Sequence, residues 1–177
     1  PSIALAISIA ITMAAQTVSI CKFVGTITLG IATGVSATVS TVALPALLAL
    51  PTAINARTSL NYLSTKSTNL SSYLRHITTF TLFSAYCLSP RRFRHPYLLY
   101  TSIFSFVSGP GVDYAVSLTA GGDEKRQVME LEAQGDEVNG EQVRLAVERK
   151  QKVEWVKTGL AGVAFAMQVV GLWGDGA

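Results

Sequence analysis

Long apolar stretches without charges alternate with short polar ones over the first 120 residues, and a charged stretch then precedes a last apolar one. Residues 23–44 run for twenty-two residues without a charge, between Lys22 and Pro45. A helix that crosses the hydrocarbon layer of a bilayer, roughly 30 Å thick, needs about 20 mainly apolar residues. Residues 23–44 are therefore predicted to form a membrane-spanning helix.

Two further spans are predicted over residues 70–89 and 97–120. The first contains Arg75 near its start, so it crosses a membrane only if that long side chain snorkels to the interface. The second begins with tyrosines and then meets Pro110, which lacks a backbone donor and should kink or break the helix. Both spans are shorter or less regular than residues 23–44.

The last apolar stretch, residues 158–173, is short but has Trp155 and Lys157 before it and ends at Trp173. Tryptophan is enriched at membrane interfaces, so residues 158–177 are interpreted as a fourth span and a short tail. Residues 122–157 are too charged to enter lipid and form a solvent-exposed loop.

The second half of this charged loop is predicted to be helical. Glu148 with Lys152 and Glu154 with Lys157 have the spacings at which opposite charges pair along a helix. This helix can continue directly into the fourth span. A charged connector and a folded binding surface are both compatible with the pattern.

Residues 1–21 are apolar enough to span, yet only Lys22 separates them from the next span. They form either one over-long helix with it, a flanking segment, or material before a start at Met13. We expect residues 1–12 to lie outside the core design. The chain is thus predicted to be all-α, a polytopic membrane helix bundle of about four transmembrane helices. Its parts are residues 1–121, with three spans, then 122–157 and 158–177.

Composition and charge agree with this division. The chain is 49% hydrophobic and 14% charged, against about 25% charged in soluble domains. Residues 1–112 hold seven bases and no acid, and residues 113–177 hold seven bases and eleven acids, so +7 and −4 give the net +3. The bases of the first part are isolated between apolar stretches, which excludes a nucleic-acid surface. The lipid bilayer is the partner that fits.

No cofactor or metal site is predicted. Cys21 and Cys87 form no motif, and neither they nor His76 and His95 have the spacing of metal ligands. No phosphate loop, nucleophile elbow or pair of catalytic acids is present, so the chain is not predicted to be an enzyme.

Small residues in two spans favour close helix packing. Gly30 and Gly34 form a G-x-x-x-G pair in the first span, and Gly159 and Gly162 lie in the fourth. In lipid, helices associate through such close backbone approaches and through polar contacts. The glycines are candidates for packing within one chain, and a homo-oligomer interface stays open as the alternative.

Asp113 is the one carboxylate within a predicted span, and an ionisable group at membrane depth suggests function. Together with Pro110 and its neighbouring glycines it can form a transport site in a broken third span. Alternatively, the span ends near Pro110 and Asp113 starts a new helical turn at the interface. The first interpretation makes the protein a small multispan transporter or channel subunit.

The connection RRFRHPYLLY between the second and third predicted spans has the composition of an interface anchor. Its arginines face lipid headgroups, its proline starts the third span, and its tyrosines lie at headgroup level. The predicted anchors are Arg91, Arg92, Arg94, His95, Tyr97 and Tyr100.

Three segments carry a resemblance to a known family. They are SICKFVGTITLGIATG in the first span, SPRRFRHPYLLYTSIF at the second connection and the closing VVGLWGDGA. They resemble the fungal autophagy-related membrane protein that serves selective autophagy of mitochondria. The resemblance covers residues 18–112 and 156–177, while residues 1–17 depart from the family pattern.

The resemblance implies a multi-pass protein of the mitochondrial outer membrane, without enzymatic activity, that promotes mitochondrial autophagy as a scaffold or regulator. Residues 122–157 are the expected contact for autophagy or outer-membrane proteins. They contain no aromatic-x-x-aliphatic motif of the kind that binds ubiquitin-like modifiers, and the two such matches, at 100–103 and 104–107, lie inside a span.

Four spans put both termini and the arginine connection on one side of the membrane. With Arg75 assigned to the opposite side, that side carries ten lysines and arginines, against four on the side of the termini. If the positive-inside tendency holds in this membrane, residues 122–157 face the cytosol.

Overall fold

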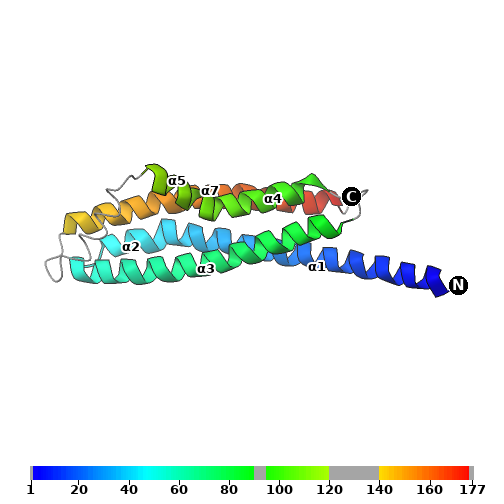
Figure 1. Ribbon diagram of the computed structural model, residues 1–177. Coiled ribbons are helices and arrows are strands. Elements are labelled where there is room, and N and C mark those ends of the chain that lie inside the picture. Colours follow the sequence, from blue (N-terminus) through cyan, green and yellow to red (C-terminus); the bar gives the residue numbers. More distant parts are fainter. Residues whose placement is uncertain (1, 90–94, 120–139, 176–177) are drawn as a thin grey trace.

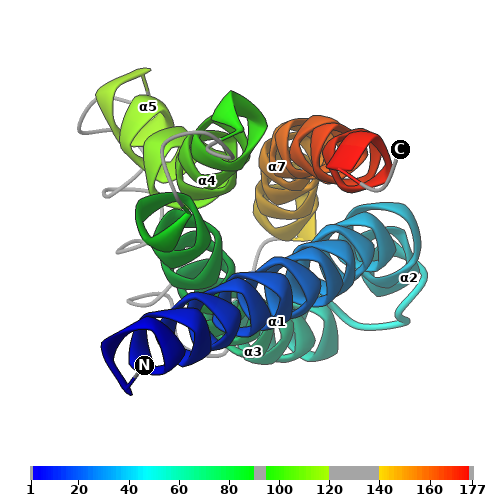
Figure 2. The same ribbon diagram turned by 90° about the vertical axis from the view of Figure 1, so that its right-hand side faces the viewer.

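The chain forms an antiparallel bundle of four long helical segments, which the computed structural model describes over residues 2–89, 95–119 and 140–175 (Figure 1). Every described element is helical, which confirms the predicted all-α class. Neighbours around the bundle are the first and second segments, the second and third, the third and fourth, and the fourth and first (Figure 2). The segments are α1 Ser2–Thr38, α3 Ala53–Leu88, α4 Pro96–Phe106 continued by α5 Val112–Thr119, and α7 Gly140–Asp175.

The N-terminal residues continue the first predicted span without a break, since α1 begins at Ser2. Its first turns project past the ends of the other helices (Figure 1). Further along, Val18 packs in a buried cluster with Leu82, Ala85 and Leu98. Of the three interpretations of residues 1–21, the structure shows the first: they form one over-long helix with the first predicted span.

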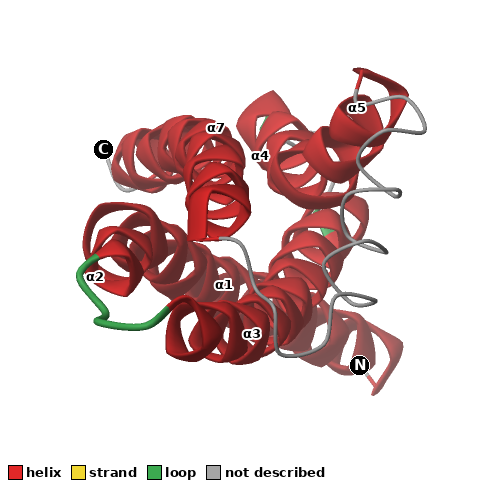
Figure 3. Ribbon diagram, turned by 90° about the vertical axis from the view of Figure 1, so that its left-hand side faces the viewer, coloured by secondary structure: helices red, strands yellow, loops and turns green. Residues whose placement is uncertain are grey.

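Two short helical elements and a non-helical turn connect α1 to α3. A π turn, η1 (Val39–Ala43), leads into α2 (Leu44–Leu48), and a non-helical turn follows (Figure 3). The hydroxyl oxygen of Thr52 accepts a hydrogen bond from the Asn55 amide at 3.4 Å, which caps the start of α3. The helix therefore begins far ahead of the span predicted at residue 70.

Pro110 interrupts the third segment without ending it. Residues Val107–Gly111 form a second π turn, η3, and α5 continues from Val112. The irregularity expected from the missing proline donor is thus a widened turn. Asp113 lies in the first turn of α5.

Buried positions recur every three or four residues along α7 and run through both its charged and its apolar part. This spacing is typical of helices that pack lengthwise in bundles. The fully buried members are Val143, Val147, Glu154, Lys157, Ala161, Ala164 and Gln168.

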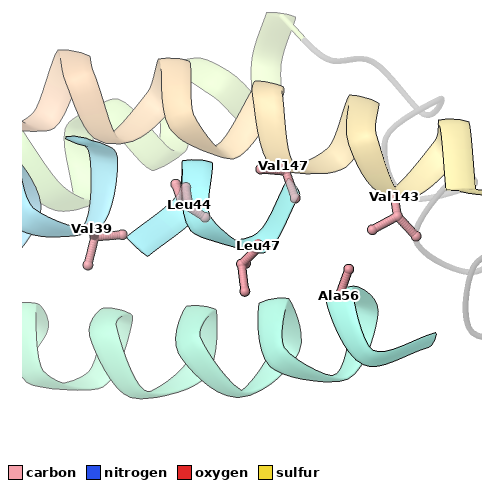
Figure 4. Close-up of a cluster of buried hydrophobic side chains, with 6 residues drawn as sticks. All are labelled: Val39, Leu44, Leu47, Ala56, Val143 and Val147. Carbon is pink, nitrogen blue, oxygen red and sulfur yellow. The ribbon is translucent and has the colours of Figure 1, made fainter. Parts of the chain in front are cut away.

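The two ends of the bundle have opposite surfaces. We call residues 44–66 and 140–153 the head, and residues 17–38, 70–88, 96–108 and 158–174 the stem. Val39, at the edge of the stem, and five head residues form an apolar cluster (Figure 4). The five are Leu44, Leu47, Ala56, Val143 and Val147.

In the stem many large apolar side chains point outward, although Leu29, Leu82 and Leu98 are buried. Among the described residues, two helices are long and apolar enough to cross a membrane, Thr12–Leu48 and Gly140–Gly174. Only 28% and 22% of their most apolar windows are buried within the bundle. The exposed side chains include Phe23, Ile27, Ile31, Phe80, Phe83, Phe106 and Val170.

Candidate functional site

Charged and polar side chains gather inside the bundle where the head meets the stem. We call this group the polar layer. It takes Arg75 from α3 and Asp113 from α5. The remaining members come from successive inward turns of α7 and are Lys150, Gln151, Glu154 and Lys157.

Two ion pairs converge on Lys157. Its ammonium Nζ lies 2.6 Å from Asp113 Oδ1 and 3.8 Å from Glu154 Oε1. The same Glu154 oxygen is 3.4 Å from Lys150 Nζ. Lys157 is 3% exposed and Glu154 is 6% exposed. Charges buried this deeply are tolerated only when they are paired, so the pairs hold α5 against α7.

Arg75 also faces the bundle interior, with 7% of its surface exposed. Its side chain therefore lies within the bundle and not along its outer surface. Its guanidinium lies on Gly109 of η3: a Cβ atom at residue 109 would come within 2.7 Å of Arg75 Nη1 and 2.8 Å of its Cδ. A larger residue at position 109 would require the arginine side chain to shift, so the observed position of the guanidinium depends on this glycine.

Both π turns touch the polar layer. Gln151 Nε2 donates a hydrogen bond to the Ser40 carbonyl of η1 at 3.0 Å, and Gly109 of η3 contacts Arg75. A π turn disturbs the regular backbone ladder and recurs at functional sites. The two π turns, η1 and η3, therefore lie at the same level of the bundle as the polar layer.

Deeper in the stem, two polar contacts join helices directly. The hydroxyls of Thr28 and Thr78 lie 2.8 Å apart, and Gln168 Nε2 donates to Thr26 Oγ1 at 3.2 Å. Contacts of this kind stabilise helix pairs in lipid, where apolar packing gains nothing over lipid contact. They tie α1 to α3 and α7.

The predicted packing glycines have unequal surroundings. A Cβ atom at Gly30 would lie 3.0 Å from the Phe165 ring, and one at Gly162 would lie 4.0 Å from Thr33. Gly34 and Gly159 would meet no atom within 4 Å. Tighter approaches lie elsewhere: Gly171 lies directly against the Tyr97 ring, and a Cβ atom at Gly25 would lie 2.5 Å from Leu82 Cδ2.

The predicted interface anchors are described in part. His95 is exposed and precedes the first residue of α4, with its ring centroid 6.0 Å from that of Tyr97. Tyr97 is half-buried, packs on Gly171 and carries the Lys22 ammonium 5.9 Å from its ring centroid. Tyr100 is exposed. Arg91, Arg92 and Arg94 lie outside the described residues.

The described part of the predicted loop, residues 140–157, is helical and continuous with residues 158–175. Val143 and Val147 pack in the head cluster, so this part is a folded surface. Of the two predicted charge pairs, Glu154 with Lys157 is present, whereas Glu148 accepts a hydrogen bond from Arg144 at 3.0 Å. Residues 122–139 lie outside the description.

The polar layer was missed because each member looks ordinary alone. Arg75 and Lys157 were interpreted as interface residues, since both stand at the ends of apolar stretches. The heptad-like spacing of Val147, Glu154 and Ala161 was the available signal, because it puts the glutamate on the buried stripe. The half-buried Gln151 and the buried Gln168 carried no separate signal. The described residues include no group of three or more potential metal ligands.

Comparisons with known proteins agree with the geometry. A family profile described as Autophagy-related protein 33 matches residues 13–127. A relative in Gibberella zeae, itself described as Autophagy-related protein 33, is 37% identical over 189 aligned positions, which cover 94% of this chain and 96% of the relative. No solved structure matches the chain.

Proposed function

The chain belongs to the Autophagy-related protein 33 family of fungi, and on that premise we propose that it promotes selective autophagy of mitochondria from within their outer membrane. It acts there as a non-enzymatic scaffold or regulator that crosses the membrane four times. The similarity to the Gibberella zeae protein, which extends over 94% of this chain, carries the autophagy role.

The outward-facing apolar side chains of the stem support an integral position. A helix in the core of a soluble protein is mostly buried, whereas only 28% and 22% of the most apolar windows of these two helices are buried. The segments 70–89 and 97–120 complete four spans when Arg75 is held inside the bundle and the half-exposed Asp113 is paired with the buried Lys157. Their charges then do not contact lipid.

The head supports a scaffold role, because it offers a folded, charged surface outside the membrane. Along α7 the side chains of Glu141, Arg144 and Arg149 are exposed, with Leu145 between them. Together with residues 122–139 this surface is the proposed contact for autophagy or outer-membrane proteins. On the cytosolic side of the membrane this surface can contact those proteins.

Two measurements in a fungus that lacks its own family member test this function. Expression of the chain should restore delivery of a mitochondrial reporter to the vacuole, and a tag inserted within residues 122–139 should be removed by protease on intact mitochondria. Replacement of residues 122–139 by a neutral linker of equal length should abolish reporter delivery, while the bundle stays in the membrane. Failure of the intact chain to restore delivery would refute the autophagy role. Survival of the tag would reverse the orientation.

The buried ion pair supports a second candidate, a small transporter or channel subunit that uses Asp113. Its carboxylate lies beside a π turn and reaches a buried lysine. Under this function the substitution Asp113→Asn abolishes ion or solute flux in reconstituted vesicles. Under the scaffold function it leaves mitochondrial autophagy largely intact, so the two assays separate the candidates.

A further inference from the structure

Arg75 is the charged group of the polar layer that the protein leaves unsatisfied. Neither Nε nor Nη2 of its guanidinium has a hydrogen-bond partner within the described part of the chain, and both are buried. Buried polar groups are nearly always paired, and a buried cation without an acceptor is costly. An arginine held in this way needs an acceptor that residues 2–89, 95–119 and 140–175 do not supply.

The two nearby carboxylates are already engaged. Asp113 Oδ1 contacts Lys157, and Glu154 Oε1 contacts Lys150 and Lys157. Both acids attract Arg75 electrostatically, but neither is hydrogen-bonded to it. Three cations and two anions leave the polar layer with a net charge of +1. The missing acceptor is therefore an anion.

The level of the polar layer indicates the chemistry of that anion. Trp155 and Tyr114 are exposed on the outside of the bundle, each next to a member of the layer in sequence. Aromatic residues of this kind favour the headgroup level of a bilayer. Phosphate oxygens are abundant at that depth, and the planar donors of arginine match them in two-bond geometry.

The layer is also open toward the outside. Asp113 is about half-exposed, and Pro110 of η3 is exposed beside the buried Gly109. Four residues before Gly109, the hydroxyl of Ser105 is buried and has no partner among the described residues, so it offers a second donor.

From these observations we infer that Arg75, lying on Gly109 between α3 and η3, binds a phosphate group. This site goes beyond the proposed function, which needs only a folded bundle. The phosphate is that of an anionic phospholipid at the membrane surface or a free phosphate ion. The lipid source rests on the proposed membrane position, whereas the free ion does not.

Thermal unfolding of the full chain in maltoside micelles, which contain no phosphate, tests the site. Dioleoyl phosphatidic acid should raise the midpoint temperature in a saturable way, and dioleoylglycerol, with the same chains and no phosphate, should not. The same shift with inorganic phosphate would identify the free ion as a ligand. Equal shifts with both lipids, or none with either lipid or with phosphate, would overturn the site.

Variants locate the binding. Arg75→Gln should weaken the affinity for phosphatidic acid, read from the concentration that gives half of the temperature shift, about tenfold or more. A hydrogen bond to a charged group is worth roughly that factor or more. Arg144→Gln, which changes an exposed arginine of the head, is the matched control and should respond as the unchanged chain does. An Arg75→Gln variant with an unchanged response would contradict the inference.

Gly109→Ala provides an independent test if Arg75→Gln does not fold. Its Cβ atom would displace the guanidinium and should weaken the response, while Gly34→Ala, which meets nothing, should leave it unchanged. The outcome also separates this site from the membrane proposal. If the chain inserts into phosphatidylcholine vesicles but shows no temperature shift with phosphatidic acid, the site alone is refuted. If it does not insert, the membrane position is refuted.

Discussion

The head and the stem are built from the same helices, but the stem buries polar side chains that the head does not. In the head, Val143, Val147 and Leu44 are inside, and the exposed surface of α7 carries charged residues. In the stem, Ser102, Thr78 and Gln168 are buried together with leucines such as Leu82, while many phenylalanines and isoleucines are outside. This partial reversal occurs along continuous helices, within a few turns of α3 and α7.

This reversal shows how strongly the solvent decides which residues a helix buries. In water a helix gains free energy when it removes apolar surface from solvent. In lipid that gain is absent, and helices associate through small residues and interhelical hydrogen bonds. The polar layer marks the change between the two regimes, and its ion pairs would be costly on a lipid-facing surface.

The strongest perturbation of the head is a charge in its core. Val147→Asp puts a carboxylate among Val39, Leu44 and Val143 and should destabilise the folded protein by about 4 kcal/mol or more, because the charge has no partner there. Leu145→Asp, at an exposed position of the same helix, should change little. Limited proteolysis and unfolding in detergent measure the effect. Equal resistance of the two variants would contradict the apolar core of the head.

Removal of Glu154 should affect the polar layer nearly as strongly. Glu154→Ala takes a buried acid from Lys150 and Lys157 and should cost about 3–5 kcal/mol of unfolding free energy. The control is Glu148→Ala, whose partner Arg144 is exposed, so that pair adds little. If both substitutions had the same small effect, Glu154 would not be part of a buried network.

In the stem, a single methyl group at the helix contact should have a moderate effect. Gly25→Ala brings a Cβ atom within 2.5 Å of Leu82 and should cost about 1–3 kcal/mol through overpacking. Gly34→Ala meets no atom and should be neutral or slightly stabilising, because alanine favours the helix. Thermal unfolding in micelles distinguishes them. A larger loss at residue 34 would instead support the predicted G-x-x-x-G contact, with a second copy of the chain as its partner.

The smallest expected effect is the loss of one interhelical hydrogen bond. Thr28→Val removes the contact to Thr78 and should cost about 0.6 kcal/mol, the mean value for such bonds in membrane helices. Thr33→Val is the matched control, since the Thr33 hydroxyl donates to Leu29 within its own helix. A cost no greater than that of the control would mean that the Thr28 contact does not stabilise the stem.

The helical class was predictable from the sequence, because long charge-free stretches and charge pairs at helical spacing both indicate helices. The interruption at Pro110 was predictable as well, since proline lacks the backbone donor. The start of α3 was not, because residues 53–69 are polar and their helix depends on packing against α2 and α7.

The inward direction of Arg75 and Lys157 was also beyond a single-sequence argument. A basic residue at the end of an apolar stretch suits an interface equally well when no partner is known. The pairing of Lys157 with Glu154 follows from their spacing on α7, but its second partner, Asp113, comes from α5, and only the folded bundle brings it to Lys157. The same holds for Gly109, whose neighbour Arg75 lies one helix away.

The opposite surroundings of head and stem can be measured by thiol labelling. Cysteine replaces Tyr62 of the head or Phe80 of the stem, which are 68% and 73% exposed, in a chain whose Cys21 and Cys87 are serine. The chain is reconstituted in phosphatidylcholine vesicles. A membrane-impermeant maleimide is added, and the vesicles are frozen and thawed so that the reagent reaches both sides of the membrane. The account predicts fast labelling at residue 62, and labelling at residue 80 only after unfolding in dodecyl sulfate. Equally fast labelling at both positions would mean that water surrounds the stem, and would contradict the account.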